Sequence, residues 1–268
     1  YKTGKYADAA RLFVQTADLL KKAKETAKAQ MVLGNTAIAY MQAEDYASAV
    51  TIYENLLSNP GKADQKILLK SYKNLVICHS HLEQHALKIQ TLERMMQALP
   101  KLPKAEISNV YAQMGDAYRA LEIYAPASAA YDKAAHLLPQ DADPRVRGRL
   151  LTAMGLCQGN MGDFASASES LTQAKELAAR ISEPLTVAES DSNLGILYWE
   201  RGDYPQALQL LNNSLETERK NTLRRNEGVD LNNLGLVKKS MGYFPDAMRA
   251  FEDALAIARE VGNVKDEA

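Results

Sequence analysis

The chain has 268 residues, and its hydrophobic content of 46% is ample for a continuous core. The 32 basic and 33 acidic residues give a formal net charge of −1, without the basic excess that a phosphate backbone requires, so we expect no nucleic-acid partner. No run of about 18 or more apolar residues occurs, so we expect no membrane-spanning helix and no membrane partner.

A repeat runs through the chain. Four similar segments begin at Met114, Met154, Leu194 and Leu234, and the glycine that follows each first residue recurs every 40 positions, at Gly115, Gly155, Gly195 and Gly235. Weaker copies open earlier, at Val76 and Ala37, each 39 residues before the next. The fixed spacing predicts one continuous repeat architecture over residues 1–268.

In chain order, the first element is a truncated repeat over residues 1–29 that carries Tyr6, Ala9 and Phe13. Full repeats then cover residues 30–68, 69–107, 108–147, 148–187, 188–227 and 228–267. Nine positions after each small residue comes an aromatic residue or its substitute: Tyr46, His85, Tyr124, Phe164, Tyr204 and Phe244. The copy over residues 69–107 departs most from the pattern.

Each full repeat is predicted to be a helical hairpin, because its apolar residues recur at intervals of three and four and separate into two segments. Asp163 and Asp203 stand where a carboxylate caps the second helix, and Pro205 and Pro245 suit its first turn. The small residue lets the second helix pack closely against the first. We expect about 60% or more of the chain to be helical, well above the average for globular proteins.

The repeated order of small residue, turn glycine, aromatic, alanine, and aromatic or leucine resembles the tetratricopeptide repeat over essentially the whole chain. The unit exceeds the usual length of about 34 residues. It is therefore similar to the extended subclass found in kinesin light chain, spindle-orientation scaffolds and bacterial arrays associated with CHAT (caspase-like) domains, as are the phrases LNNLGL from Leu231 and LAIAREVGN from Leu255. The resemblance implies an all-α, right-handed superhelical solenoid of antiparallel helix pairs.

Neither terminus carries the polar cap that a solenoid end needs, so we expect the chain to be a fragment of a longer array. Two cysteines are too few for a disulfide framework, which favours a reducing, cytoplasmic location. Cys78 and Cys157 lie two repeats apart, and we expect them to be free thiols.

Repeat proteins of this kind bind an extended segment or a helix of a partner protein on a concave face, so the sequence predicts a protein-interaction scaffold. An alternative is a regulatory arm of a larger effector, such as a caspase-like protease or a signalling NTPase, which the resemblance alone suggests. An enzyme is disfavoured, because neither a nucleophile elbow nor a glycine-rich phosphate loop is present. We expect no cofactor.

The peptide-binding residues are predicted from a second recurring position, two residues before the small residue of each repeat. Four of its six occupants are asparagine and one is glutamine: Asn35, Asn74, Gln113, Ala153, Asn193 and Asn233. A carboxamide both donates and accepts, so such a row can bond a peptide backbone of any sequence. The alternative is that these side chains merely solvate a polar face inherited by duplication.

Residues that flank this row would then determine which peptide side chains are preferred. Lys70, Lys73, Arg119 and Arg149 favour an acidic segment near the early repeats, and Trp199 offers an apolar anchor further on. Two clusters, Arg145 to Arg149 and Lys220 to Arg225, have the simpler interpretation of solvated linkers.

His79, His81 and His85 have a spacing that invites a zinc site. The predicted hairpin turn falls between His81 and His85, and no third ligand is apparent, so packed or partly exposed histidines are favoured and no metal is expected.

Overall fold

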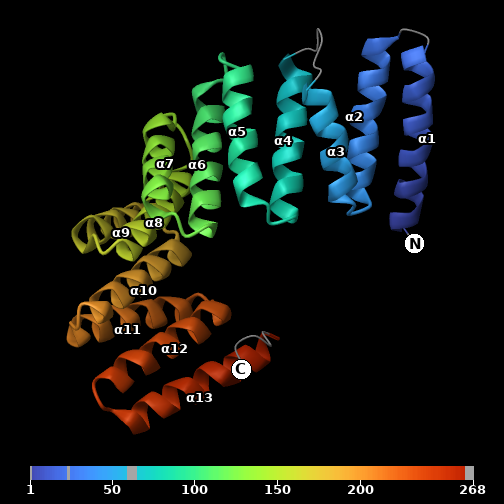
Figure 1. Cartoon of the computed structure of the whole chain (residues 1–268). Helices are drawn as coiled ribbons and strands as arrows, with labels where there is room; N and C mark the ends of the chain where they lie inside the picture. Colours follow the sequence, from blue (N-terminus) through green and yellow to red (C-terminus); the bar gives the residue numbers. More distant parts are fainter. Residues whose placement is uncertain (1, 23–24, 59–64, 263–268) are drawn as a thin grey trace. The chain divides into compact units, whose positions relative to one another are not determined.

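The computed structural model describes residues 2–22, 25–58 and 65–262, and all regular elements within these ranges are α-helices (Figure 1). The helices belong to two compact units, Tyr1–Ile123 and Tyr124–Ala268. The predicted all-α class, a solenoid of paired helices, is confirmed, and the helix content exceeds the expected share. No helix among the described residues is long and apolar enough to cross a membrane.

The described part of the first unit forms six helices, each packed against the next one in the chain. They are α1 (Lys2–Lys22), α2 (Thr26–Gln42), α3 (Tyr46–Ser58), α4 (Gln65–His81), α5 (His85–Ala98) and α6 (Lys104–Ala120). Large side chains that are almost completely buried, among them Tyr53, Leu75, Leu92 and Met95, form its core. The core therefore runs along the stack instead of gathering at one centre.

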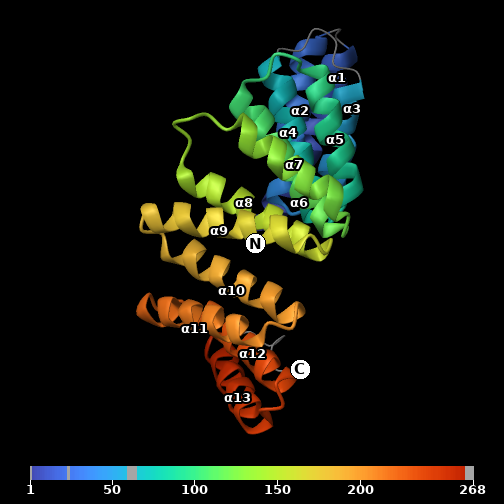
Figure 2. The same cartoon turned by 90° about the vertical axis from the view of Figure 1, so that its left-hand side faces the viewer.

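Residues 124–262 of the second unit form seven helices, and α9 to α12 lie one after another in Figure 2. The helices are α7 (Tyr124–Leu137), α8 (Pro144–Asn160), α9 (Phe164–Arg180), α10 (Pro184–Glu200), α11 (Tyr204–Lys220), α12 (Arg224–Ser240) and α13 (Phe244–Glu260). Besides the contacts between consecutive helices, α10 touches both α8 and α12. The first helices of successive hairpins thus form a row.

The turns between the paired helices share one backbone device. In the first unit the left-handed position is occupied by glutamate, at Glu44, Glu83 and Glu122, and in the second unit by glycine, at Gly162, Gly202 and Gly242. The predicted caps follow these turns, because the carboxylates of Asp163 and Asp203 accept hydrogen bonds from the backbone N–H groups of Ser166 and Gln206. Pro205 and Pro245 lie in the first turns of α11 and α13, as predicted.

Replacing Glu83 by glycine is expected to raise the stability of the first unit by about 0.5 to 1 kcal/mol, because Glu83 has a φ of 54° that side chains with a Cβ disfavour. The reverse change in the second unit, Gly202→Ala, should lower stability by a similar amount, since no atom lies near the added Cβ and only the backbone strain at φ 79° remains. Thermal unfolding of both variants measures the two effects. Equal signs for the two changes would contradict this explanation.

The small residue of the repeat permits close helix packing, as predicted. A Cβ added to Gly155, Gly195 or Gly235 would lie 2.8, 2.9 or 2.5 Å from the nearest side-chain atom of the second helix, and the three atoms belong to Leu171, Leu211 and Phe251. Glycine is needed at these positions because a side chain would have no room there.

The three histidines of the second full repeat have different surroundings. His79 is buried, with Nδ1 2.9 Å from the side-chain oxygen of Gln84, whereas His81 is exposed and stacks on Tyr46 with ring centroids 4.1 Å apart. His85 begins the next helix, α5. Among the described residues no group of three or more histidine, cysteine or acidic side chains is arranged to hold a metal ion.

Candidate functional site

A cavity of about 150 Å³ opens between α2, α3 and α4 in the first unit. Its apolar wall comes from all three helices, with Met31 and Ile38 on α2, Leu56 on α3 and Ile67 on α4. Met31 is 62% exposed and Ile67 is 51% exposed, although both side chains are aliphatic and adjoin the cavity. Large apolar side chains exposed around a cavity mark a surface suited to binding.

A hydrogen bond fixes the orientation of one polar side chain in this cavity, that of Asn74. The Asn74 side-chain NH2 donates a hydrogen bond to the Tyr53 hydroxyl at 2.7 Å, and that hydroxyl faces the Met41 sulfur at 3.7 Å. Burial raises the pKa of Tyr53 to about 12, although the bond from Asn74 lowers it, so the hydroxyl keeps its proton. The Asn74 carbonyl oxygen is therefore held in place and has no hydrogen-bond partner among the described residues.

Two further polar residues of the cavity are exposed to solvent. They are Asn35 and Lys70, and both line it. Gly34 also lines it, and a Cβ added to Gly34 would meet no atom within 4 Å. Because glycine is unfavourable inside a helix, a glycine without a packing reason in the wall of a cavity preserves open space.

The same arrangement recurs one repeat later in the first unit. A cavity of about 200 Å³ between α4, α5 and α6 is lined by Gln113, by the exposed Ile77 and by Lys73. Here Lys73 forms an ion pair with Glu106, with the Lys73 nitrogen 2.7 Å from a carboxylate oxygen. Lys73 is thus partly neutralised, whereas Lys70 carries no ion pair among the described residues.

In the second unit a smaller cavity of about 70 Å³ lies between α8, α9 and α10, and Asn193 lines it. Three members of the predicted carboxamide row, Asn74, Gln113 and Asn193, thus occupy equivalent positions in three cavities. Asn233 is placed differently, because its NH2 group donates to the Asp230 carboxylate at 3.2 Å.

Other residues predicted from the sequence are separate from these cavities. Arg119 and Arg149 are exposed on α6 and α8, and Arg119 already has an interaction partner within the chain. Trp199 on α10 is partly buried against the core, and its indole N–H donates to the Ser240 hydroxyl at 2.9 Å. Both cysteines are buried free thiols, as predicted, and burial raises the pKa of Cys78 to about 11.

Sequence reasoning missed the apolar wall of the first cavity and Gly34. The signal available was an aliphatic residue at helix positions outside the repeat's core pattern, as at Met31 and Ile67. Such residues are common on protein surfaces, so the pattern carries meaning only once three helices are seen to bring them together.

Two models of the tetratricopeptide repeat match the chain, over residues 148–180 and 186–260. A comparison with curated protein sequences gave no match.

Several solved structures are similar over much of this chain. Aspartyl phosphate phosphatase F from Bacillus subtilis is 11% identical, covers 99% of this chain and 75% of its own, and has a TM-score of 0.72. The apo form of RapI is 15% identical, covers 97% of this chain and 76% of its own, and has a TM-score of 0.71. A putative kinesin light chain of Podospora anserina with TPR-like repeats is 18% identical, covers 71% of this chain and 94% of its own, and has a TM-score of 0.58. At these identities the similarity concerns the fold.

Proposed function

We propose that this chain, a tetratricopeptide-repeat protein, binds an extended peptide segment of a partner protein along its first helices, with the cavity between α2, α3 and α4 as the main anchor. The observation that carries the proposal is the meeting, in one cavity, of exposed aliphatic side chains, the oriented Asn74 carboxamide and Lys70, which has no ion pair among the described residues. A peptide offers the matching groups, namely apolar side chains, backbone amides and carboxylates.

The apolar wall selects an aliphatic or small aromatic side chain. An apolar cavity of about 150 Å³ takes up a group the size of benzene, so this space accepts one anchoring side chain of the peptide. Burying such a side chain contributes about 1.5 to 3 kcal/mol. The exposed portions of Met31 and Ile67 would be covered at the same time.

The polar groups favour a peptide backbone with a carboxylate nearby. The free Asn74 carbonyl oxygen accepts a backbone N–H, and the exposed Asn35 carboxamide donates or accepts. Lys70 lies at the same cavity and attracts a carboxylate beside the anchor, which agrees with the acidic segment predicted from the sequence. Gln113 and Asn193 extend the same chemistry to other repeats, and the role of Trp199 as a second anchor stays a prediction.

Known complexes on this fold support the proposal. The Rap conjugation gene regulator of plasmid pLS20 was solved in complex with the Phr* peptide, and its chain is 16% identical to this one, with a TM-score of 0.61. A Rap protein was likewise solved in complex with competence and sporulation factor. The fold therefore accommodates such ligands, and the cavity residues of this chain decide which peptide it takes.

The substitution Gly34→Leu is expected to fill the cavity and to weaken peptide binding at least about tenfold, equivalent to about 1.4 kcal/mol. Peptides are first selected from a random displayed library on the full chain, and their affinities are then measured by calorimetry. Gly34→Ala is the matched control, because it changes the helix in the same way but leaves most of the cavity open.

Both variants should unfold at or above the temperature of the original chain, since the added atoms meet open space. If selected peptides bind Gly34→Leu as tightly as the original chain, the binding surface lies elsewhere and the proposal fails. Selected sequences without an apolar residue would also contradict it.

A further inference from the structure

The second unit contains an unusual concentration of buried carboxyl groups. Glu218 and Asp230 are each 1% exposed, Asp191 is 2% exposed and Glu227 is 5% exposed. They come from three helices, α10, α11 and α12, that pack against one another. Buried carboxylates are costly unless they are paired with cations or hydrogen-bonded, so each needs a partner or a proton.

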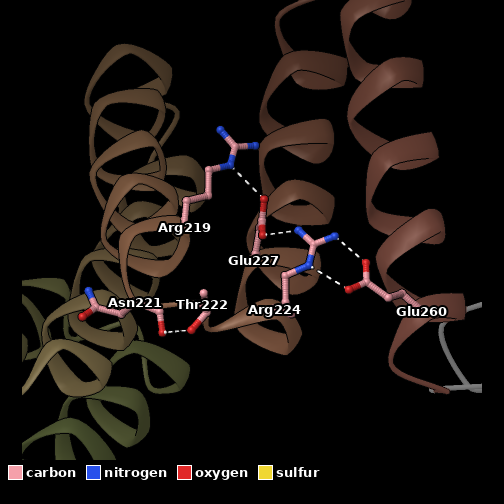
Figure 3. Close-up of polar contacts among 6 residues, drawn as sticks. All are labelled: Arg219, Asn221, Thr222, Arg224, Glu227 and Glu260. Carbon is pink, nitrogen blue, oxygen red and sulfur yellow. Dashed lines mark hydrogen bonds and ion pairs between the residues drawn. The ribbon is translucent and has the colours of Figure 1, made fainter.

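Three cations serve this cluster, and they form their ion pairs with carboxylates other than Glu218 and Asp230. The Lys175 nitrogen lies 2.6 Å from an Asp191 oxygen. The guanidinium groups of Arg219 and Arg224 both bind Glu227, and Arg224 also reaches Glu260, as Figure 3 shows. Arg219 follows Glu218 directly in the sequence, yet its side chain points to Glu227.

Glu218 and Asp230 are the members of the cluster that form no ion pair with any residue the structure describes. One Asp230 oxygen accepts hydrogen bonds from Ser192 and Asn233, but the other oxygen is buried without a partner. One Glu218 oxygen is also buried without a partner. The two side chains lie on α11 and α12, which pack against each other, and the charge of Asp230 acts on Glu218.

Ser214 lies beside this pair without satisfying it. Its hydroxyl donates to the Ala188 carbonyl oxygen at 2.9 Å, and one oxygen each of Glu218 and Asp230 stays buried without a partner. A negative charge on such oxygens is costly in a buried site, and a proton bound by the pair removes part of that charge.

We propose that the Glu218–Asp230 pair binds one proton in the folded protein at neutral pH, and that this buried proton holds α10, α11 and α12 together. The stability of the second unit then decreases as the pH rises. The proton removes the repulsion between two buried carboxylates and part of the cost of burying their charge. The inference is independent of the proposed function, because it concerns the core of the second unit.

The electrostatic surroundings agree with this assignment. Burial, together with the charges of Asp230 and Glu227, raises the pKa of Glu218 to about 8, against the lowering effects of Ser214 and Arg219. Burial also raises the pKa of Asp230, and Asp191 adds to the rise, whereas hydrogen bonds from Ser192, Ser214 and Asn233 lower it.

Glu227 behaves in the opposite way. Burial raises its pKa, but the hydrogen bonds from Arg219 and Arg224 outweigh burial and bring the pKa below its usual value. Lys175 on α9 and Glu260 on α13 complete the charged groups around the cluster, and they act through Asp191 and Arg224 respectively. The proton therefore belongs to the Glu218–Asp230 pair and not to Glu227.

The direction of the pH effect follows from linkage. The unfolded chain releases the Glu218 proton near its ordinary pKa of 4.5, whereas the folded chain keeps it up to about pH 8. Between these values the folded state binds one proton more, so its stability decreases as the pH rises. One bound proton corresponds to a change of about tenfold per pH unit in the folding equilibrium constant.

The experiment is urea unfolding of the full chain at a series of pH values between about 5.5 and 8, followed by fluorescence of the sole tryptophan, Trp199 on α10, which reports on the second unit. The original chain should lose stability by up to about tenfold in equilibrium constant per pH unit. Glu218→Gln should remove most of this slope. The matched control is Glu216→Gln on the same helix, where Glu216 is exposed, and it should keep the full slope.

An unchanged slope in Glu218→Gln would overturn the proposal. A second measurement needs no variant: infrared spectra of the original chain in heavy water at neutral pH should contain the carbonyl band of a protonated carboxyl group. Absence of that band in the folded chain would also overturn the proposal, even if Glu218→Gln failed to fold.

Discussion

Replacing Leu211 by alanine is expected to lower the free energy of unfolding of the second unit by about 2 to 5 kcal/mol. Leu211 is fully buried in a cluster with Ala207, Leu215 and Leu231, and it lies against Gly195 of the preceding helix. The loss combines the transfer of the missing carbons with the cavity that a rigid helix pair leaves behind. Urea unfolding followed by Trp199 fluorescence measures it, because Trp199 packs against the same cluster.

Leu185→Ala is the matched control for this change, since Leu185 lies in the same unit and is 36% exposed. Its effect should be about 1 kcal/mol or less, because little apolar area is returned to water. Equal losses for the two variants would show that Leu211 is not at the centre of the packing between α10 and α11.

Replacing Gly195 by leucine is expected to lower the free energy of unfolding of the second unit by about 1 to 3 kcal/mol or more through overpacking. A Cβ at Gly195 would lie 2.9 Å from the Leu211 Cγ and 3.4 Å from the Ala207 carbonyl oxygen. Both atoms belong to α11 close to its backbone, so the helices must separate. Thermal and urea unfolding, again with Trp199 as the probe, measure the loss.

Gly148 provides the control for the conformational part of this change. A Cβ at Gly148 would meet Thr186 at 3.7 Å, an ordinary contact, so Gly148→Ala should stabilise its helix by up to about 1 kcal/mol. Gly195→Ala gains the same helix propensity but also creates the overlap, and it should be the less stable of the two alanine variants. Combining Gly195→Leu with Leu211→Ala should recover part of the loss, because the removed side chain occupies the contested space. Strict additivity in that double variant would contradict the contact.

The fold was predictable because its determinants are local and repeated. Each copy carries the same local signals, namely a small residue facing the next helix, a turn, and a cap such as Asp163 or Asp203. In the structure these features lie at the predicted positions. A single ambiguous copy, like the one with His79, is then assigned by its neighbours. Its histidine is buried in the core, as the repeat position requires.

The candidate site was predictable only in part. The recurrence of the carboxamides led to Asn74, Gln113 and Asn193, which line cavities, but not to the apolar wall at Met31 and Ile67. The wall depends on which side chains three separate helices present to one space, and no short sequence pattern contains that information.

The buried carboxyl groups were hidden from sequence reasoning for a related reason. Asp191, Glu218 and Asp230 belong to residue types that usually mark the solvated face of a helix. Their burial follows from the packing of α10, α11 and α12, and the cations nearby bind other members of the cluster, as Arg219 binds Glu227 and Lys175 binds Asp191. Only the complete set of ion pairs shows which carboxyl groups are left without a cation.

The equal spacing of the left-handed glycines in the second unit has a consequence for evolution by recombination. Gain or loss of one whole repeat in the gene keeps every turn in register, because each hairpin has its turn glycine at the same place. Each hairpin also packs a glycine of its first helix against a bulky side chain of its second helix. The carboxyl cluster restricts where such an event is tolerated. Lys175 with Asp191, and Ser192 with Asp230, join neighbouring hairpins through partners that a copied repeat would separate. Changes in array length are therefore expected outside α9 to α13, because the buried acidic side chains of the described residues all lie within these helices.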